Sequence, residues 1–378
     1  MKFITTHSLL SKILALLLLL SLVPAQAKEQ LSDIETRSLL RQVTLQSILP
    51  IYRELDNNAQ NLVTTTRQFC DGPNERGLNK VRETWSETLS SWQRASPLLF
   101  GPATEDSIDF TIYFRPIKKA VINGFLNKIK ADSTFSIDKE AVDQSGVGGQ
   151  GLAALEYLLF DRKQADIAIL SAYTDSKTGK QRCEYIVAIE ELLASNVNTI
   201  VEAWEPDSGN YSEAFYTAGD GSAHFTKAYQ PIELLVNRLY QAIQAVEIKK
   251  LGVPLGLQGG RTGKMQVYPY KLEAWRSGHS LQNVMSVLQG FKRLLVDGGI
   301  LEVLKKNKHK ALALELEEQM NKILASKFKS EDLFQLLKEP SAEVTIFHMQ
   351  IKEFAGTIGN GLAPVLGVQL GFNQNDGD

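Results

Sequence analysis

The chain has 378 residues, of which 43% are hydrophobic and 22% charged, and its formal net charge is −2. Because acidic and basic residues nearly balance and no basic block occurs, the composition argues against nucleic-acid binding. The length is sufficient for two domains or for one large domain with a substantial core.

The first residues predict a secretory signal peptide at 1–27. Lys2 and Lys12 precede the apolar run "ILALLLLLSLV", and Ala25 and Ala27 complete a small-residue cleavage pattern. An uncleaved anchor is the alternative, but the run is short, and no later segment reaches the ~18 unbroken apolar residues of a spanning helix. We therefore expect an exported protein of the periplasm or cell envelope. Cleavage would remove both lysines and no acidic residue, which changes the net charge from −2 to −4.

Most of the remaining sequence has apolar residues at the three- and four-residue spacing of amphipathic helices. Strand-like alternation is scarce, and its best example, "TIYFRP" at 111–116, contains a proline that favours the approach to a helix. The pattern predicts an all-α fold of helical bundles. The predicted helices are 31–66, 75–96, 181–203, 223–249, 280–296 and 311–326.

Polar or glycine-rich stretches punctuate the predicted helices at 100–110, 206–223 and 249–270. The second stretch lies near the middle of the mature chain, so we expect a first helical domain at 30–207 and a second at 222–371. The third is a long irregular loop, a feature that is usually functional or disordered inside a compact domain. The polar end of the chain, 372–378, is predicted to be a disordered tail.

The chain has two cysteines, Cys70 and Cys183, both in the predicted exported part. In an oxidising compartment such a pair forms a disulfide more often than a metal or redox site. We expect a disulfide that brings the two positions together in the fold.

The histidines of the mature part do not have the spacing that places two metal ligands on one helical face. No nucleophile elbow, P-loop or dinucleotide-binding motif occurs either. The histidines concerned are His224, His279, His309 and His348.

The stretch "GQGLAALEYLLFD" at 149–161 predicts a buried helix that carries one carboxylate. Glu156 lies four residues after Leu152 and three before Leu159, so it falls on the apolar stripe. Burying an ionised carboxylate is costly unless a cation, a metal or hydrogen-bond donors offset the loss of water. Either the helix edge reaches water at Glu156, or a partner meets the carboxylate.

A second stretch, "KLEAWRSGHSLQN" at 271–283, follows the long loop and enters a predicted helix. Ser277 or Ser280 is expected to cap that helix and leave its first backbone N–H groups available to an anion or an oxygen atom. Glu273, Arg276 and His279 lie at the same corner. The alternative is an ordinary capped helix start with solvated charges.

At these residues the sequence resembles the imelysin-like family of bacterial envelope proteins. The resemblance implies an all-α fold of two helical-bundle domains related by a pseudo-repeat. It rests on "FC" at 69–70, "WSETLSSWQRASPLLFGP" at 85–102, "GQGLAALEYLLFD" at 149–161, "RC" at 182–183, "GVPLG" at 252–256 and "EAWRSGHSLQNV" at 273–284.

The family signature is G-x-H-x-x-E, and this chain departs from it. Gly151 and Glu156 match, but Ala153 stands where the histidine belongs. Some family members are classed as metallopeptidases, and alanine can neither bind a metal nor move a proton. Arg115 is a second departure, since the position before the proline is usually a tryptophan.

The resemblance also implies a ligand site between the two domains, because the family includes iron-regulated envelope proteins and the periplasmic component of an iron-uptake system. An arginine facing Glu156 would supply the countercharge that a buried carboxylate needs. Glu156 is also the single candidate metal ligand. By position, the ligand-binding residues would be Gly151, Glu156, Glu273, Arg276, Ser277, Ser280 and Arg115.

Three functions are consistent with these features. We favour an exported, non-catalytic binding protein in iron homeostasis, because the signature histidine is missing. Its ligand would be polar or metal-associated, with iron or another divalent metal left open, and its partner a small ligand or another envelope protein. The alternatives are a zinc-type metallopeptidase with Glu156 as base, and a structural module in which Glu156 and Arg276 hold two domains together.

Overall fold

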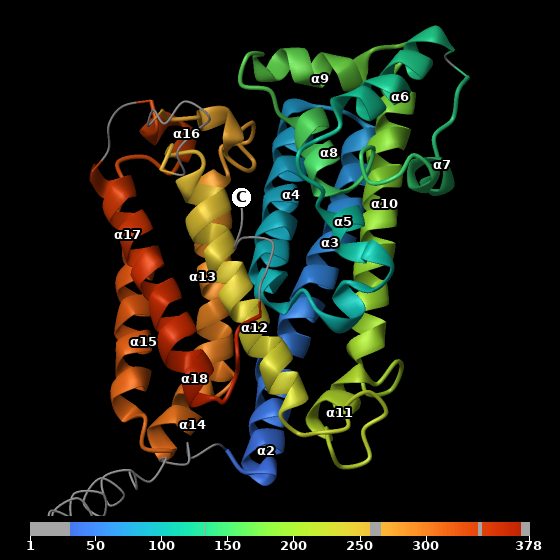
Figure 1. Cartoon of the computed structure of the whole chain (residues 1–378). Helices are drawn as coiled ribbons and strands as arrows, with labels where there is room; N and C mark the ends of the chain where they lie inside the picture. The colour runs from blue at the N-terminus through green and yellow to red at the C-terminus, as the bar shows by residue number, and fades with distance from the viewer. Residues whose placement is uncertain (1–30, 133, 258–265, 339–341, 372–378) are drawn as a thin grey trace, which may run out of the picture. The chain divides into compact units, whose positions relative to one another are not determined.

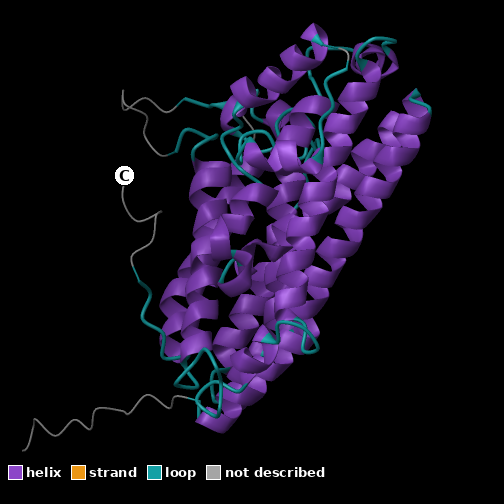
Figure 2. Cartoon of the chain, turned by 90° about the vertical axis from the view of Figure 1, so that its right-hand side faces the viewer, coloured by secondary structure: helices purple, strands orange, loops and turns teal. Residues whose placement is uncertain are grey.

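The computed structural model describes residues 31–132, 134–257, 266–338 and 342–371. Within these residues the chain forms helices and loops and no strand (Figure 2), which confirms the all-α class. The predicted signal peptide and C-terminal tail lie outside the described residues, as does part of the 249–270 loop. The chain from Leu31 onward forms one compact unit, and its division into two domains stays a prediction.

Three long helices, α3, α4 and α10, organise the first half of the chain. α3 packs against both α4 and α10 (Figure 1). Asn74 caps α4, since its side chain accepts a hydrogen bond from the N–H of Gly77 at 2.9 Å. The elements of this half are α2 (Asp33–Val43), the π-helix η1 (Thr44–Ile48), α3 (Leu49–Asp71), α4 (Glu75–Ala95), the 3₁₀ turns η2 (Ser96–Leu98), η3 (Gly101–Ala103) and η4 (Glu105–Ser107), α5 (Ile108–Ile112), α6 (Lys119–Ala131), α7 (Lys139–Gln144), α8 (Gly151–Leu159), α9 (Asp166–Thr174) and α10 (Gly179–Trp204).

In the second half, α13 packs along α4 and α12 packs against η2, so helices from the two halves share contacts. The elements are α11 (Tyr211–Tyr216), α12 (Gln230–Gln244), the π-helix η5 (Ala245–Gly252), the 3₁₀ turn η6 (Pro269–Lys271), α13 (Ser280–Lys292), the π-helix η7 (Arg293–Asp297), α14 (Ile300–Lys306), α15 (Lys310–Leu324), α16 (Leu333–Leu336), α17 (Ala342–Thr357), the π-helix η8 (Ile358–Leu362) and α18 (Ala363–Val365).

The predicted helices are confirmed, with differences at their ends. The helix expected to start at 223 begins at Gln230, because residues 222–229 form turns before Pro231. The polar stretch 206–223 contains α11, whose Tyr211 and Phe215 are buried and pack against Trp204. Aromatic packing therefore orders a stretch whose polar composition predicts only a linker.

The expected disulfide is confirmed between Cys70 at the end of α3 and Cys183 in the first turns of α10, with their Cα atoms 5.7 Å apart. The bond joins positions 113 residues apart. It ties the ends of two helices that already pack along each other. Among the described residues, no helix is both long enough and apolar enough to span a membrane.

One carboxyl group lies fully buried between α3 and α10. Glu190 is 0% exposed, and its Oε1 accepts a hydrogen bond from Thr66 Oγ1 at 2.9 Å. Its Oε2 has no hydrogen-bond partner. Burial raises the pKa of Glu190 well above its usual value, because the low-dielectric core disfavours the charged form.

We predict that Glu190→Gln stabilises the protein at pH 8. The folded state holds the Glu190 proton more tightly than the unfolded state, so wild-type stability falls as the pH rises above the unfolded pKa. The loss is about 1.4 kcal/mol for each pH unit up to the folded pKa. Glutamine keeps the acceptor for Thr66 and has no charge to bury. Urea unfolding from pH 4 to pH 8 would show the gain growing with pH.

Glu191→Gln is the matched control, because Glu191 pairs with Arg67 on the exposed side of the same helix at 2.6 Å. Removing that pair is expected to change stability by no more than about 1 kcal/mol. If Glu190→Gln were less stable than the wild type at pH 8, this would contradict a raised pKa of Glu190 in the folded protein.

Candidate functional site

The helix that carries Glu156, α8, begins in a place that requires glycine. Gly151 has a φ of +74°, and a Cβ there would lie 2.5 Å from the backbone oxygens of Thr111 and Ile112. Gly151 therefore serves the close packing of α8 on α5. Apart from Tyr157, every residue of α8 is buried. The site is a carboxylate held inside an apolar helix.

The carboxylate of Glu156 is 1% exposed, and its hydrogen-bond partners come from a turn 120 residues later in the chain. Its Oε1 accepts hydrogen bonds from the backbone N–H of Arg276 at 3.0 Å and of Ser277 at 3.1 Å, and from Ser277 Oγ at 3.2 Å. Its Oε2 lies 3.7 Å from Arg115 Nη1. Three donors on Oε1 and one cation near Oε2, which itself makes no hydrogen bond, thus offset part of the cost of burying this charge.

The two arginines of the predicted site have different roles. Arg115 supplies the countercharge, and its Nη2 donates to the backbone oxygen of Leu272 at 3.0 Å. Arg276 contributes its backbone N–H, while its guanidinium lies over the rings of Trp275 and Tyr157. The charge opposite Glu156 therefore comes from Arg115.

The turn at 274–279 directs its N–H groups toward Glu156. Ala274 has a φ of +46° and Gly278 one of +84°, and the N–H groups of Gly278 and His279 both donate to the Ala274 oxygen at 3.1 Å. This curvature leaves the Arg276 and Ser277 N–H groups facing one oxygen, as in an anion-binding nest. The anion expected at this helix start is supplied by the chain itself.

The predicted serine cap of α13 is wrong. α13 begins at Ser280 with His279 at its N-cap position, and neither serine side chain accepts a bond from its first turn. Ser280 Oγ donates to the backbone oxygen of Glu273, and Ser277 Oγ donates to Glu156 and to the Ala274 oxygen. Both hydroxyl groups are used to hold the turn.

Glu273, at the other end of this turn, is also paired inside the protein. It forms an ion pair with Lys250, whose Nζ also donates to Gln93 Oε1 at 2.9 Å, and it accepts a bond from Asn283 Nδ2 at 3.4 Å. Burial acts to raise the pKa of Glu273, but the cations of Lys250 and Arg115 outweigh it and lower the pKa below its usual value. Glu273 is therefore an ionised structural partner of the turn.

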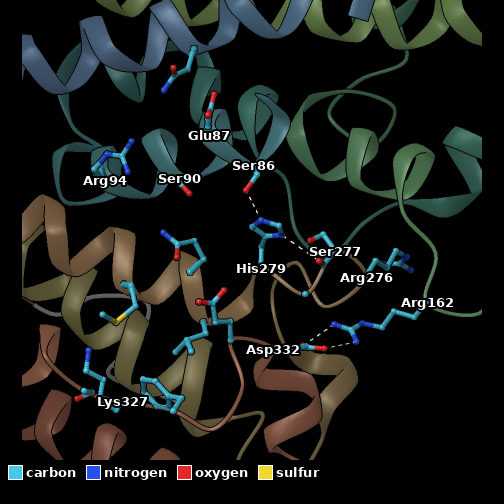
Figure 3. Close-up of a pocket in the computed structure, with 18 of the residues that line it drawn as sticks. Ser86, Glu87, Ser90, Arg94, Arg162, Arg276, Ser277, His279, Lys327 and Asp332 are labelled. Carbon is cyan, nitrogen blue, oxygen red and sulfur yellow. Dashed lines mark hydrogen bonds and ion pairs between the residues drawn. The ribbon is translucent and has the colours of Figure 1, made fainter. Parts of the chain in front are cut away.

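A polar cavity of about 1180 Å³ adjoins the turn and includes Arg276, Ser277 and His279 in its wall (Figure 3). Glu156 lies behind Ser277 and is not part of the lining. Two arginines of the wall are already paired: Arg162 makes a two-point contact with Asp332 at 2.6 and 2.7 Å, and Arg94 contacts Glu54 at 2.6 Å. Other charged lining residues are Glu87, Arg276, Lys327 and Glu331.

His279 is turned toward α4 and not toward Glu156. Its Nδ1 faces the Ser277 backbone oxygen at 3.3 Å, so this nitrogen carries the proton and Nε2 accepts from Ser86 Oγ (Figure 3). Burial lowers the pKa of His279, so the ring is neutral at neutral pH. The Ser86–His279 hydrogen bond joins the turn to α4.

The comparisons with known proteins agree with this picture of an all-α protein. The Imelysin family model (Peptidase_M75) matches residues 48–350, and the chain therefore belongs to the imelysin family. This confirms the resemblance seen in the sequence. The search of curated proteins found no match.

Two solved structures share the fold. An imelysin-like protein from Psychrobacter arcticum 273-4 superposes with a TM-score of 0.74 at 20% identity, over 91% of this chain and 99% of that chain. A protein from Parabacteroides distasonis ATCC 8503, proposed to be an iron-regulated protein A precursor, has a TM-score of 0.69 at 17% identity, over 89% of this chain and 96% of that chain. At these identities the likeness concerns the fold alone.

The residues around Glu156 do not fit the catalytic metal that a metallopeptidase requires. Such a site needs about three protein ligands and an open position. Within the described part of the chain, no group of three or more His, Cys, Asp or Glu residues could hold a metal ion. Glu156 faces N–H groups and a guanidinium, which are hydrogen-bond donors and cannot ligate a cation. Ala153, three residues before Glu156, is 3% exposed and offers no ligand atom from its side chain.

We predict that Glu156→Gln destabilises the protein by about 1–3 kcal/mol. Glutamine can keep one oxygen on the Arg276 and Ser277 N–H groups, but its amide would then face the Arg115 guanidinium, donor against donor. Urea unfolding at neutral pH measures the loss. The control is Glu83→Gln, which removes an exposed ion pair with Lys80 and is expected to cost less than about 1 kcal/mol. Equal stabilities of Glu156→Gln and the wild type would contradict a stabilising carboxylate.

Proposed function

We propose that this imelysin-family chain is an exported, non-catalytic binding protein of the cell envelope that holds a polar, metal-associated ligand and acts in iron homeostasis. The observation that carries the proposal is the polar cavity beside a carboxylate whose Oε1 is held by three donors of its own chain, while its Oε2 lies 3.7 Å from Arg115 and makes no hydrogen bond. A carboxylate with three hydrogen-bond donors and an arginine contact serves to shape a site. It is poorly placed to act as a base.

The composition of the cavity wall supports a small ligand of mixed polarity. Its lining includes four cations and four acidic residues, and hydroxyl groups contribute both donors and acceptors. Arg276 is the cation of this wall that belongs to the turn held by Glu156, so its position depends on the buried carboxylate. A ferric chelate of a polycarboxylate presents both carboxylate and hydroxyl oxygens, which such a wall can bind. The hydroxyl groups are those of Ser86, Ser90, Ser277 and Ser326.

Three further observations support export and a link to iron. The sequence of residues 1–27 has the pattern of a secretory signal, and the Cys70–Cys183 disulfide suits an oxidising compartment. The name of the Parabacteroides neighbour refers to iron regulation.

Calorimetric titration with ferric citrate, ferrous sulfate and zinc chloride tests the proposal. We expect ferric citrate to bind and zinc to give no heat of binding. Arg276→Gln should weaken ferric citrate binding by at least about tenfold, which is 1.4 kcal/mol. The matched control is Arg37→Gln on α2, which lies outside the cavity lining and should leave the affinity unchanged.

Absence of binding by all three probes would contradict the proposal. Its non-catalytic part would be overturned by cleavage of casein that is sensitive to chelators, restored by zinc and lost in Glu156→Gln. That result would support the metallopeptidase alternative.

A further inference from the structure

A second cavity, of about 900 Å³, lies between α4, α5, α12 and the π-helix η5. It also adjoins the turn that holds Glu156, because Glu273 is part of its wall, whereas Ser277 is part of the first cavity. The two linings have no residue in common. A ligand in the second cavity would therefore contact a different set of side chains.

Arg238 on α12 is the residue of this second wall that most needs a partner. Its Nη1 donates to Gln241 Oε1 at 2.7 Å, but its Nε is buried without a hydrogen-bond partner. Within the described residues, no carboxylate lies in ion-pair contact with it. Asp109 of the same wall acts on Arg238 electrostatically but makes no ion-pair contact with it. A largely buried guanidinium whose Nε has no hydrogen-bond partner is costly, so an anion placed against it would be stabilised. Consistent with this, burial lowers the pKa of Arg238.

The charged residues that line this cavity have a net charge of +1. Arg238, Lys249 and Lys250 are the cations of the lining, and Asp109 and Glu273 are the acids. Lys250 and Glu273 neutralise each other in an ion pair. The remaining two cations exceed the one remaining acid by a single charge, which a monoanion would balance.

Aromatic side chains make up much of the apolar part of the same wall. Trp92, Phe110 and Tyr113 all line the cavity, and Phe110 is 50% exposed although it is a large hydrophobic residue. Such rings favour a flat, apolar ligand body. The Tyr113 hydroxyl is buried beside the Asn283 and Arg115 side chains, and burial raises its pKa well above the usual value, so it stays protonated and can donate.

A π-helix, one of four in the described part of the chain, also contributes to this wall. η5 is a π-helix of eight residues, Ala245–Gly252, and it supplies Ala245, Lys249 and Lys250 to the lining. π-Helical segments are rare and occur frequently at functional sites. The wider turn of η5 thus coincides with the cationic part of the cavity.

We propose that this second cavity is a binding site for a small aromatic monocarboxylate, whose carboxylate pairs with Arg238 and whose ring packs among Trp92 and Phe110. The site is separate from the first cavity, and it goes beyond the proposed function.

Binding of benzoate to the purified full chain tests this site, with benzyl alcohol and benzylamine as probes of the same size. Calorimetry should show saturable benzoate binding at least about tenfold tighter than that of benzyl alcohol, with no binding of benzylamine. Arg238→Gln should weaken benzoate binding by at least about tenfold, and Arg238→Lys should keep part of it. Arg276→Gln, in the first cavity, should leave it unchanged.

Lys249→Gln provides a second test that does not disturb a buried group, because Lys249 is exposed. It should weaken benzoate binding about two- to fivefold through the lost charge. The proposal is overturned if benzoate shows no saturable binding up to about 10 mM. It is equally overturned if benzyl alcohol binds as tightly as benzoate. It is also overturned if Arg276→Gln abolishes benzoate binding while Arg238→Gln, shown to be folded, binds benzoate as tightly as the wild type. None of these results bears on ferric citrate binding in the first cavity.

Discussion

The buried carboxylate of Glu156 is the constraint around which the rest of the site is arranged. An ionised group at 1% exposure inside an apolar helix must be met by donors or by a cation. The 274–279 turn supplies two backbone N–H groups, and Arg115 supplies the charge. Because the helix and the turn come from distant parts of the chain, this interaction ties α8 to the 274–279 turn that precedes α13.

The bonds between Glu156 and the 274–279 turn also determine which side chains of the turn and of the adjoining Glu273 line the two cavities. Ser277 and His279 reach the first cavity because the turn is curved around Glu156, and Glu273 reaches the second. The carboxylate is thus a positioning group for two walls. This role needs only the glutamate and its donors, and no histidine beside it.

The sequence predicts the helices from the spacing of apolar residues and the disulfide from the two cysteines. It also predicts that Glu156 needs a partner, because burying a charged side chain is costly. It does not predict that the donors are backbone N–H groups, because these have no sequence signal and depend on the positive φ of Ala274. The serine caps fail for the same reason, since the turn uses the hydroxyl groups of Ser277 and Ser280. The sequence also does not predict the role of Arg238, because the residues next to it in the chain do not indicate that its Nε is buried.

Amide hydrogen exchange at Arg276 and Ser277 tests the central claim most directly. If both N–H groups donate to Glu156, they exchange slowly in the wild type, and Glu156→Ala should accelerate both by at least about tenfold. The amide of Asn283, which donates to the His279 oxygen within α13 at 2.9 Å, should keep its protection and serves as the internal control. Fast exchange of the two turn amides in the wild type, or unchanged protection in Glu156→Ala, would contradict the account.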